Sequence, residues 1–426
     1  MRDSIKRQYH WIIAAIVLLE MFVYVGILNN IVSLYVIPVS ETLGIKRGDY
    51  SLAFSAKAMA GAVSVVVSGP LLRRIGYRKM VSFFLLVAVA AFFVLSASQN
   101  LFMLFLGAIM IGLCEGSCLT AGASYVISSW FHRYCGSVLG LVTAATGIGG
   151  SVMCTFLTRI IGSAGWRTSF AVCGVMTAAV AILIGLLARD YPHLLGRKPF
   201  GEGDHTKDNP VRKRDDHWHG FPMEKLLRMP SFYLTILEVF LSCLCLYIAF
   251  YVIVPYLQSR GFSASDAATM QSIMLLGMAG FKLLCGVLSD WVGAKFATGL
   301  CLTATVISFG LLITANTYSS ALLAVLVFSL ALPLTTVTIP LLTASLFGYG
   351  THNTTLGIFL AMPAVAGMIA GPTTNMVFDK VGSYLPAFRA ALILAVAVFF
   401  LHIIICILSY WDRKRLDREE ALVQND

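Results

Sequence analysis

Long, nearly uninterrupted apolar runs, separated by short polar or charged segments, make up most of the chain. A helix of ~20 apolar residues crosses a bilayer, and the runs are too uniformly apolar for the alternating strands of a membrane barrel. The pattern therefore predicts helical spans, twelve in all, at 11–38, 49–72, 80–98, 101–128, 136–158, 168–188, 232–257, 266–289, 296–315, 320–347, 354–377 and 388–410. A polar stretch at 189–231 separates a first half, residues 1–188, from a second half, residues 232–426, with six spans in each.

The composition supports this interpretation. The chain has 426 residues, of which 58% are hydrophobic and 12% charged, whereas soluble chains have ~45–50% apolar and ~25% charged residues. This excludes a soluble enzyme, a disordered chain and a small secreted scaffold. The first apolar run is too long for a signal-peptide core, so we expect it to remain as the first crossing.

The distribution of cations predicts the orientation. The net charge is +10, from 31 Lys and Arg against 21 Asp and Glu. If the amino terminus is cytoplasmic, the cytoplasmic segments contain 22 of the 31 cations and the outer loops contain seven. Because cationic loops remain in the cytoplasm, we expect both termini and the central loop on that side of the inner membrane. The same argument explains the positive charge without a nucleic-acid partner.

The two halves are related by a repeat. Residues of the same type recur 217 positions apart, in the pairs Pro38 and Pro255, Asp49 and Asp266, Gly69 and Gly286, Gly76 and Gly293, Gly140 and Gly357, Gly150 and Gly367, and Gly165 and Gly382. Glycine and proline mark turns and close packing, so these matches indicate a shared backbone. Two parallel six-helix repeats suit alternating access, with substrate bound between them near the middle of the membrane.

A loop motif occurs in both halves, at the predicted cytoplasmic ends of the second and eighth spans. The copies run from Gly69 to Lys79 and from Gly286 to Lys295. Both resemble the G-x-L-x-D-R-x-G-R-R loop of the major facilitator superfamily. The resemblance implies an all-α membrane protein with twelve transmembrane helices in two pseudo-symmetric six-helix bundles. It also implies that the loops act in gating, through Gly69, Arg73, Gly76, Arg78, Gly286, Asp290, Gly293 and Lys295.

Three further stretches resemble the monocarboxylate-porter and oxalate/formate-antiporter branches of this superfamily. They are 130–136, with its Trp-Phe pair, 165–170, with its Gly-Trp-Arg, and 379–384, which reads Asp-x-x-Gly-Ser-Tyr. The likeness implies a small organic anion as substrate. Two departures from these branches narrow the class of substrate. Lys282 stands where the branches usually have Arg, and the eleventh span has no cation. A dicarboxylate held between two cations therefore fits poorly. In the first loop motif, Arg73 stands where the superfamily usually has Asp. We therefore predict that the charge contact expected to lock this gate is absent or rewired.

Five charged side chains fall within predicted spans, where a charge costs roughly 2.5–3.5 kcal/mol unless it faces a cavity or a partner. We predict that Lys57 and Lys282, with Tyr24 and Gln271, bind the substrate. The carboxylates are predicted to take up a coupled proton, with Glu20 and Glu115 preferred to Glu238 because the first and fourth helices line the cavity in this superfamily.

Structural interpretations of the same residues remain open. Glu238 and Lys282 lie at the same depth on consecutive helices, so they could form an ion pair with no role in transport. A pair between Lys57 and Glu115 is also possible. His402, in the last span, is less favoured as a proton relay because that helix is usually peripheral.

Carrier function is favoured over the other classes. The sequence has no HExxH, GxSxG or P-loop motif, so neither an enzyme nor transport powered by ATP hydrolysis within the chain is expected. We expect no cofactor or metal, and a protein that works as a monomer in the bilayer with an organic anion and protons as partners. The alternative is a proton-driven exporter of an amphipathic or cationic compound, consistent with three buried glutamates.

Overall fold

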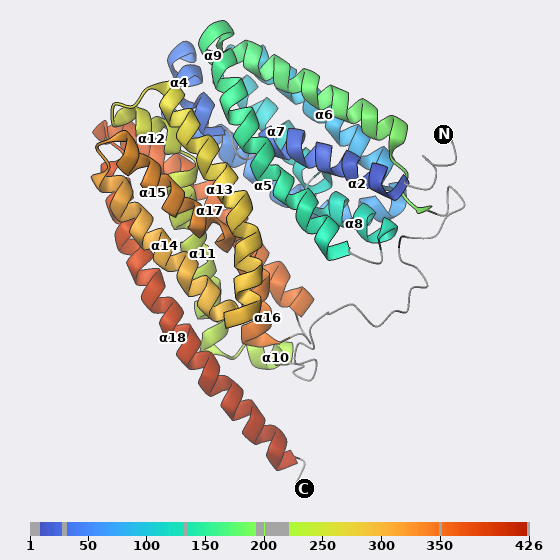
Figure 1. Cartoon of the computed structure of the whole chain (residues 1–426), viewed down its shortest axis with the longest axis vertical. Coiled ribbons are helices and arrows are strands. Elements are labelled where there is room, and N and C mark those ends of the chain that lie inside the picture. The colour runs from blue at the N-terminus through green and yellow to red at the C-terminus, as the bar shows by residue number, and fades with distance from the viewer. Residues whose placement is uncertain are drawn as a thin grey trace. The chain divides into compact units, whose positions relative to one another are not determined.

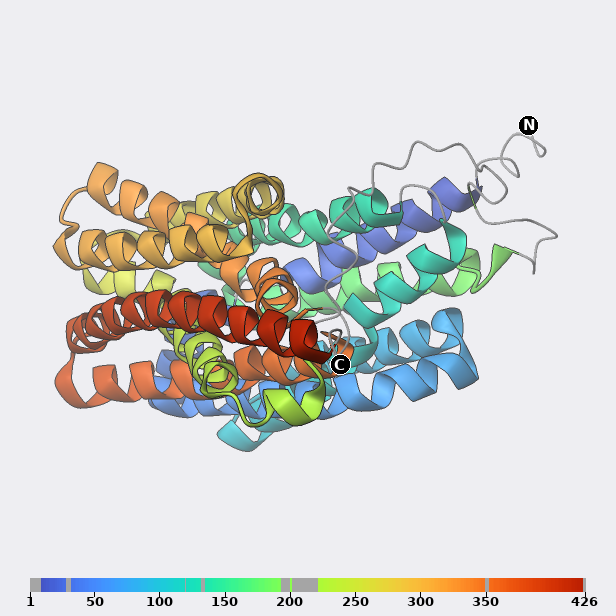
Figure 2. The same cartoon turned by 90° about the horizontal axis from the view of Figure 1, so that it is seen from below.

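The computed structural model describes residues 9–27, 32–118, 120–131, 135–192, 200, 221–348 and 352–423. These residues are almost entirely helical (Figures 1 and 2). The predicted central loop, except for its two ends and Phe200, lies outside them. Phe200 forms an isolated parallel bridge with Phe131.

The first half folds into the helices α2 (Tyr9–Glu20), α4 (Val32–Leu43), α5 (Arg47–Ile75), α6 (Tyr77–Ser96), α7 (Leu101–Cys118), α8 (Thr120–Trp130) and α9 (Cys135–Leu187), with a π-helical turn η1 (Met21–Val25). The long α9 contains the predicted fifth and sixth spans. They are separated by a sharp break at Gly165, whose φ of 82° is readily adopted by glycine.

The second half contains α10 (Met223–Leu226), α11 (Pro230–Phe250), α12 (Ile253–Ser259), α13 (Ala264–Val292), α14 (Ala294–Thr314), α15 (Tyr318–Ala331), η3 (Leu332–Thr335), α16 (Thr338–Phe347), α17 (His352–Val381) and α18 (Leu385–Val423). In Figure 1, α18 continues towards the carboxyl terminus well past the end of α14, beside which it packs.

Each of the twelve predicted spans coincides with one or more of these helices, which confirms the twelve-helix architecture. Several spans are not single straight helices, however. The seventh is interrupted between α11 and α12, where Val252 leaves the helical conformation. The tenth passes through η3, which has Pro333 at its start. Proline removes a backbone donor and clashes with the preceding turn, so an α-helix is disfavoured there.

The repeat is visible in the backbone. The helix α5 and its counterpart α13 both have 29 residues and begin and end 217 positions apart. Glycines with positive φ occur at the same offset, at 44 and 261, 76 and 293, and 165 and 382. Matching helix ends and matching turns show that the two halves share one folding pattern.

Contacts divide the chain into two compact units. The larger unit comprises 1–209, 250–283 and 371–384, and the smaller comprises 210–249, 284–370 and 385–426. The units differ from the two sequence halves because parts of α13 and α17 pack with the first half. In the larger unit α5 packs on α7 and α6 packs on α9, and in the smaller unit α14 packs on α15 and α18.

Close backbone contacts hold the larger unit together. Gly26, which follows η1, lies against Gly149 and Gly150 of α9: a Cβ added at Gly26 would lie 2.8 Å from backbone atoms of both. A Cβ at Gly149 would lie 2.0 Å from the carbonyl oxygen of Phe22. Small residues at such crossings allow membrane helices to approach closely. This contact fixes the position of the first span, which contains Glu20 and Tyr24.

Candidate functional site

Lys57 of α5 and Glu115 of α7 form a buried ion pair. Lys57 Nζ lies 2.9 Å from Glu115 Oε1, and the side chains are only 8% and 12% exposed. Two glycines make room for it. A Cβ at Gly112 would lie 2.2 Å from the Lys57 carbonyl oxygen, and one at Gly61 would lie 2.3 Å from Glu115 Oε2. The pairing that the sequence left open is therefore formed.

Glu20 ends α2 and is buried. The Tyr77 hydroxyl donates a hydrogen bond of 2.6 Å to Glu20 Oε2, whereas Glu20 Oε1 has no hydrogen-bond partner among the described residues. Tyr77 begins α6, directly after Gly76 of the first loop motif. A contact thus connects this loop with a carboxyl group in the membrane. Tyr24, also buried, lies one turn further along, beside Cys114 of α7.

Gln271 of α13 is buried where three helices meet. Its Oε1 accepts a hydrogen bond of 3.0 Å from Ser33 Oγ of α4 and lies 3.7 Å from Cys154 Sγ of α9. One residue further along, the Ser272 hydroxyl lies 2.9 Å from that of Thr155. These polar contacts hold α13 to helices of the first half.

Lys282 lies on the same side of α13 as Gln271, eleven residues along, at a rise of about 16 Å. Between them, α13 packs on α9 so closely that a Cβ at Gly147 would lie 2.8 Å from that of Ala279. Lys282 follows less than one turn later and is partly buried. Within the described residues it has no carboxylate partner.

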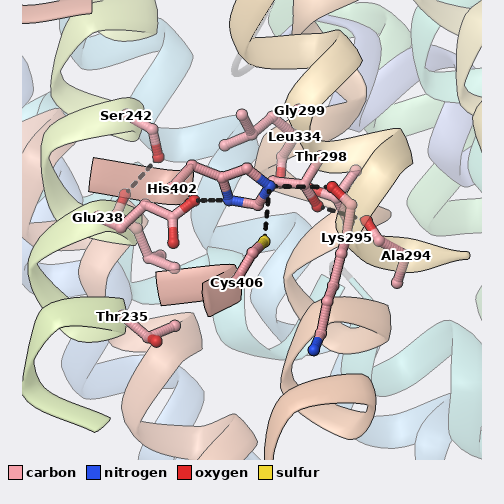
Figure 3. Close-up of polar contacts among 12 residues, drawn as sticks. Thr235, Glu238, Ser242, Ala294, Lys295, Thr298, Gly299, Leu334, His402 and Cys406 are labelled. Atoms are coloured by element: carbon pink, nitrogen blue, oxygen red, sulfur yellow. Dashed lines mark hydrogen bonds and ion pairs between the residues drawn. The ribbon is translucent and has the colours of Figure 1, made fainter. Parts of the chain in front are cut away.

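Glu238 of α11 bonds to His402 of α18 (Figure 3). His402 Nδ1 lies 2.6 Å from Glu238 Oε1, and His402 Nε2 lies 2.9 Å from the carbonyl oxygen of Lys295. Glu238 and Lys282 fall in different units. The structure therefore gives Glu238 a different partner from the one that the depth argument suggested. The sequence signal for this contact was a lone histidine in an apolar span.

Both loop motifs form tight turns between consecutive helices. Gly76 and Gly293 have φ of 84° and 91°. In the first loop, Asp190 accepts a hydrogen bond of 2.7 Å from the Arg78 backbone, and Arg78 Nε donates one of 2.7 Å to the Gly185 carbonyl. In the second loop, Lys295 Nζ donates to Ser409 Oγ at 3.0 Å. Gly286 has open space around it.

The sequence did not single out Asp190, which follows the sixth span and supplies a carboxylate to the first loop. The side-chain positions of Arg73 and Asp290 and the surroundings of Gly69 lie outside the described part of the structure, so the predicted rewiring at Arg73 stays a prediction.

The Asp-x-x-Gly-Ser-Tyr stretch contacts the start of α5. Asp379 accepts hydrogen bonds from the backbone of Gly48 at 2.7 Å and of Arg47 at 3.3 Å. Arg47 donates to the Tyr384 hydroxyl at 3.1 Å, and its guanidinium lies 4.0 Å from the centre of the Phe378 ring. Asp379 thus caps another helix, where a carboxylate is favoured by the free amides and the helix dipole.

Two more residues extend this contact. The Tyr384 hydroxyl donates to Asn375 Oδ1 at 2.8 Å, and Asn375 donates to Ser51 Oγ at 2.7 Å. Burial raises the pKa of Tyr384 to about 12, so its hydroxyl remains a donor at neutral pH. We call the residues Arg47, Gly48, Ser51, Asn375, Asp379 and Tyr384 the α5–α17 clasp.

Comparison with known proteins identifies the family. The sequence model of the family described as Major Facilitator Superfamily matches residues 13–334 of this chain. The chain belongs to the major facilitator superfamily. It is therefore a multi-pass integral membrane protein of a transporter family, and its buried polar groups are to be considered as parts of a carrier.

Three of the similar proteins are distant in sequence but match almost the whole chain. A probable sulfoacetate transporter of Cupriavidus necator is 23% identical over 401 residues, which is 90% of each chain. Among solved structures, a mutant of the nucleoside transporter NupG matches with a TM-score of 0.75 and 12% identity, over 93% of this chain and 99% of its own. A D-xylose–proton symporter matches with a TM-score of 0.70 and 15% identity, over 92% and 97%. The structural matches support the major facilitator fold.

The predicted site residues that the structure describes differ in whether they already have a charged or hydrogen-bonding partner. Lys57 and Glu115 neutralise each other, and Glu238 bonds to His402. Glu20 has one hydrogen-bonded oxygen, and Lys282 has no anionic partner in the described part of the chain. Among the described residues, no three or more His, Cys, Asp or Glu side chains are grouped so that they could hold a metal ion.

Proposed function

We propose that this protein is a secondary active transporter that moves a small organic anion, of the monocarboxylate type, across the cytoplasmic membrane by alternating access. The observation that carries the proposal is Lys282, a cation within a membrane span that has no carboxylate partner among the described residues. A charge in this position is expensive unless something neutralises it. An anionic substrate is the natural counter-charge.

Two arguments support an anion. Lys57, the other lysine within a predicted span, already has Glu115 at 2.9 Å, so Lys282 is the better anchor for a carboxylate. The relative from Cupriavidus necator is described as a probable transporter of sulfoacetate, which is itself a small organic anion. Gln271 and Tyr24 complete the proposed substrate contacts as hydrogen-bonding groups.

Glu20 is the proposed site of proton coupling. It is buried and has one oxygen without a partner, so its carboxyl group can hold a proton at low electrostatic cost within the membrane. Its bond to Tyr77 connects it to the first loop motif. Coupling by anion exchange is the other mode compatible with this arrangement. The cation distribution supports cytoplasmic termini, and the carrier is proposed to work as a monomer.

Uptake into proteoliposomes tests the proposal. The purified protein is supplied with radiolabelled small carboxylates and sulfoacetate, with and without an imposed pH gradient. We expect saturable uptake of at least one anion, and we expect Lys282→Gln to reduce it by about 100-fold or more, in keeping with the loss of a buried charge partner, ~3–5 kcal/mol. Lys282→Arg keeps the charge and is expected to retain part of the activity.

Controls separate the two roles. Glu20→Gln is expected to remove stimulation by the pH gradient while anion exchange across the membrane continues. Unchanged uptake in Lys282→Gln would refute the anion anchor. A wild-type protein that ignores every carboxylate but expels a cationic dye in response to a pH gradient would support the exporter alternative instead.

A further inference from the structure

A pocket of about 420 Å³ lies where α6 begins and α9 ends. Its lining residues come from both helices and from the turn after α9. They are Arg78, Lys79, Ser82, Gly185, Arg189 and Asp190. Arg78 and Lys79 immediately precede the apolar part of α6, and Arg189 and Asp190 immediately follow that of α9. The pocket therefore lies at the edge of the membrane, on the side predicted to be cytoplasmic.

The pocket has an excess of positive charge, with three cations and one carboxylate. Among the described residues, carbonyl groups and not carboxylates accept the hydrogen bonds of its guanidinium groups. Arg78 Nε donates to Gly185, and Arg189 donates to the Leu186 and Ala188 carbonyls at 3.2 and 2.8 Å. Asp190 accepts a hydrogen bond from the Arg78 backbone. These bonds fix the guanidinium groups and leave their charges without an anionic partner in the described residues.

Ser82 supplies a second, independent observation. Its hydroxyl is buried and has no hydrogen-bond partner among the described residues. It faces α9 at the level of Gly185, where an added Cβ would lie 3.5 Å from Ser82 Oγ. A buried hydroxyl without a partner is unfavourable, so a group with acceptor oxygens is expected to reach it.

Apolar side chains continue from the pocket along the same two helices. Phe83 of α6 is 60% exposed and Leu86 is 56% exposed, while Ile182 and Leu186 of α9 are 58% and 63% exposed. In Figure 1, α6 and this part of α9 run side by side, as their contacts require. A cationic pocket at the membrane edge is thus continuous with a surface that faces acyl chains.

We propose that this pocket binds the phosphate headgroup of an anionic phospholipid, with the acyl chains along α6 and α9. Arginine and lysine match phosphate oxygens in charge and geometry, and basic pockets between membrane helices on the cytoplasmic side bind such headgroups. Free phosphate shares the headgroup chemistry but lacks the chains. The bound lipid would connect the first gating loop, which contains Arg78, to the end of the sixth span.

Native mass spectrometry of the detergent-solubilised protein tests this. Phosphatidylglycerol and phosphatidylcholine with identical acyl chains are titrated, along with inorganic phosphate and glycerol phosphate. We expect one tight site for phosphatidylglycerol, with an affinity about fivefold lower for each cation removed and about 25-fold lower in Lys79→Gln/Arg189→Gln. Ser82→Ala is expected to weaken binding by a smaller factor.

The control is Arg159→Gln, an exposed cation of α9 that lies before the break at Gly165 and does not line the pocket. It should bind phosphatidylglycerol like the wild type. Lys79→Gln alone removes an exposed side chain with no described hydrogen bond, so it keeps the test valid if the double variant unfolds. Equal loss in Arg159→Gln, no preference over phosphatidylcholine, or equally tight binding of inorganic phosphate would each overturn the proposal. Because lipid binding is measured without transport, the result is independent of the substrate.

Discussion

The ionisable side chains that the sequence places within the membrane have different partners in the structure. Lys57 bonds to Glu115 and Glu238 bonds to His402, at 2.9 and 2.6 Å. The sequence singled out Lys57, Glu115 and Glu238 as charges within spans and considered a pair between Lys57 and Glu115, but it favoured His402 less. It could not choose between partners, because depth along a span says little about which neighbouring helix a side chain faces.

The Lys57–Glu115 pair gives a prediction at this scale. Removing one partner of a buried pair leaves an uncompensated charge and is expected to destabilise the protein by ~3–5 kcal/mol, whereas replacing both by apolar residues is often neutral. We therefore expect Lys57→Met to lower the thermal unfolding temperature in detergent. The double variant Lys57→Met/Glu115→Leu is expected to recover most of the loss.

The two variants also distinguish structure from transport. If the pair is only structural, the stable double variant should take up substrate. A double variant as unstable as Lys57→Met would contradict the pairing.

At the scale of helices, the sequence predicted all twelve spans but not their interruptions. The π-helical turn η1 reads Met-Phe-Val-Tyr-Val, which contains no glycine or proline to mark it. The tenth span, by contrast, has Pro333 at its break. Apolar runs continue through both places, so hydropathy alone does not separate a straight span from a broken one. Tertiary contacts such as that between Phe22 and Gly149 decide the local geometry.

The crossing of α9 and η1 gives a prediction for these elements. A Cβ at Gly149 would lie 2.0 Å from the Phe22 carbonyl oxygen, so Gly149→Ala must separate two backbones. Overpacking in a core costs about 1–3 kcal/mol, and contact with backbone, which cannot rotate away, favours the upper end. We expect a clear fall in the thermal unfolding temperature.

Gly140→Ala is the matched control on the same helix, because a Cβ there would meet nothing within 4 Å. Alanine is the better helix former, by ~1 kcal/mol, so this variant should be at least as stable as the wild type. Equal destabilisation by the two substitutions would mean that α9 does not cross η1 as described.

Across the whole molecule, the sequence predicted the duplication correctly, and the matched helix ends and positive-φ glycines extend it. It did not predict which segments of the two halves pack together. In the sequence, the Asp-x-x-Gly-Ser-Tyr stretch indicated only a resemblance to two branches of the superfamily. Its contacts with Arg47 and Gly48 are seen only in the folded structure. Such contacts join positions more than 300 residues apart, as from Gly48 to Asp379, and no local pattern encodes them.

The α5–α17 clasp gives the last prediction. It joins spans of the two sequence halves, and alternating access requires these halves to move against each other. An ideal Cβ at Gly48 lies 2.9 Å from Met376 Cγ and 3.6 Å from the Met376 backbone nitrogen. A disulfide joins Cβ atoms about 3.5–4.5 Å apart, so Gly48→Cys/Met376→Cys is expected to cross-link on mild oxidation. The bond is detected by mass spectrometry of digested protein, which separates it from disulfides of the ten native cysteines.

Because the cross-link holds the clasp closed, uptake should stop on oxidation and return on reduction, while each single variant remains insensitive to oxidant. Transport that continues with the cross-link complete would show that the clasp does not open during the cycle.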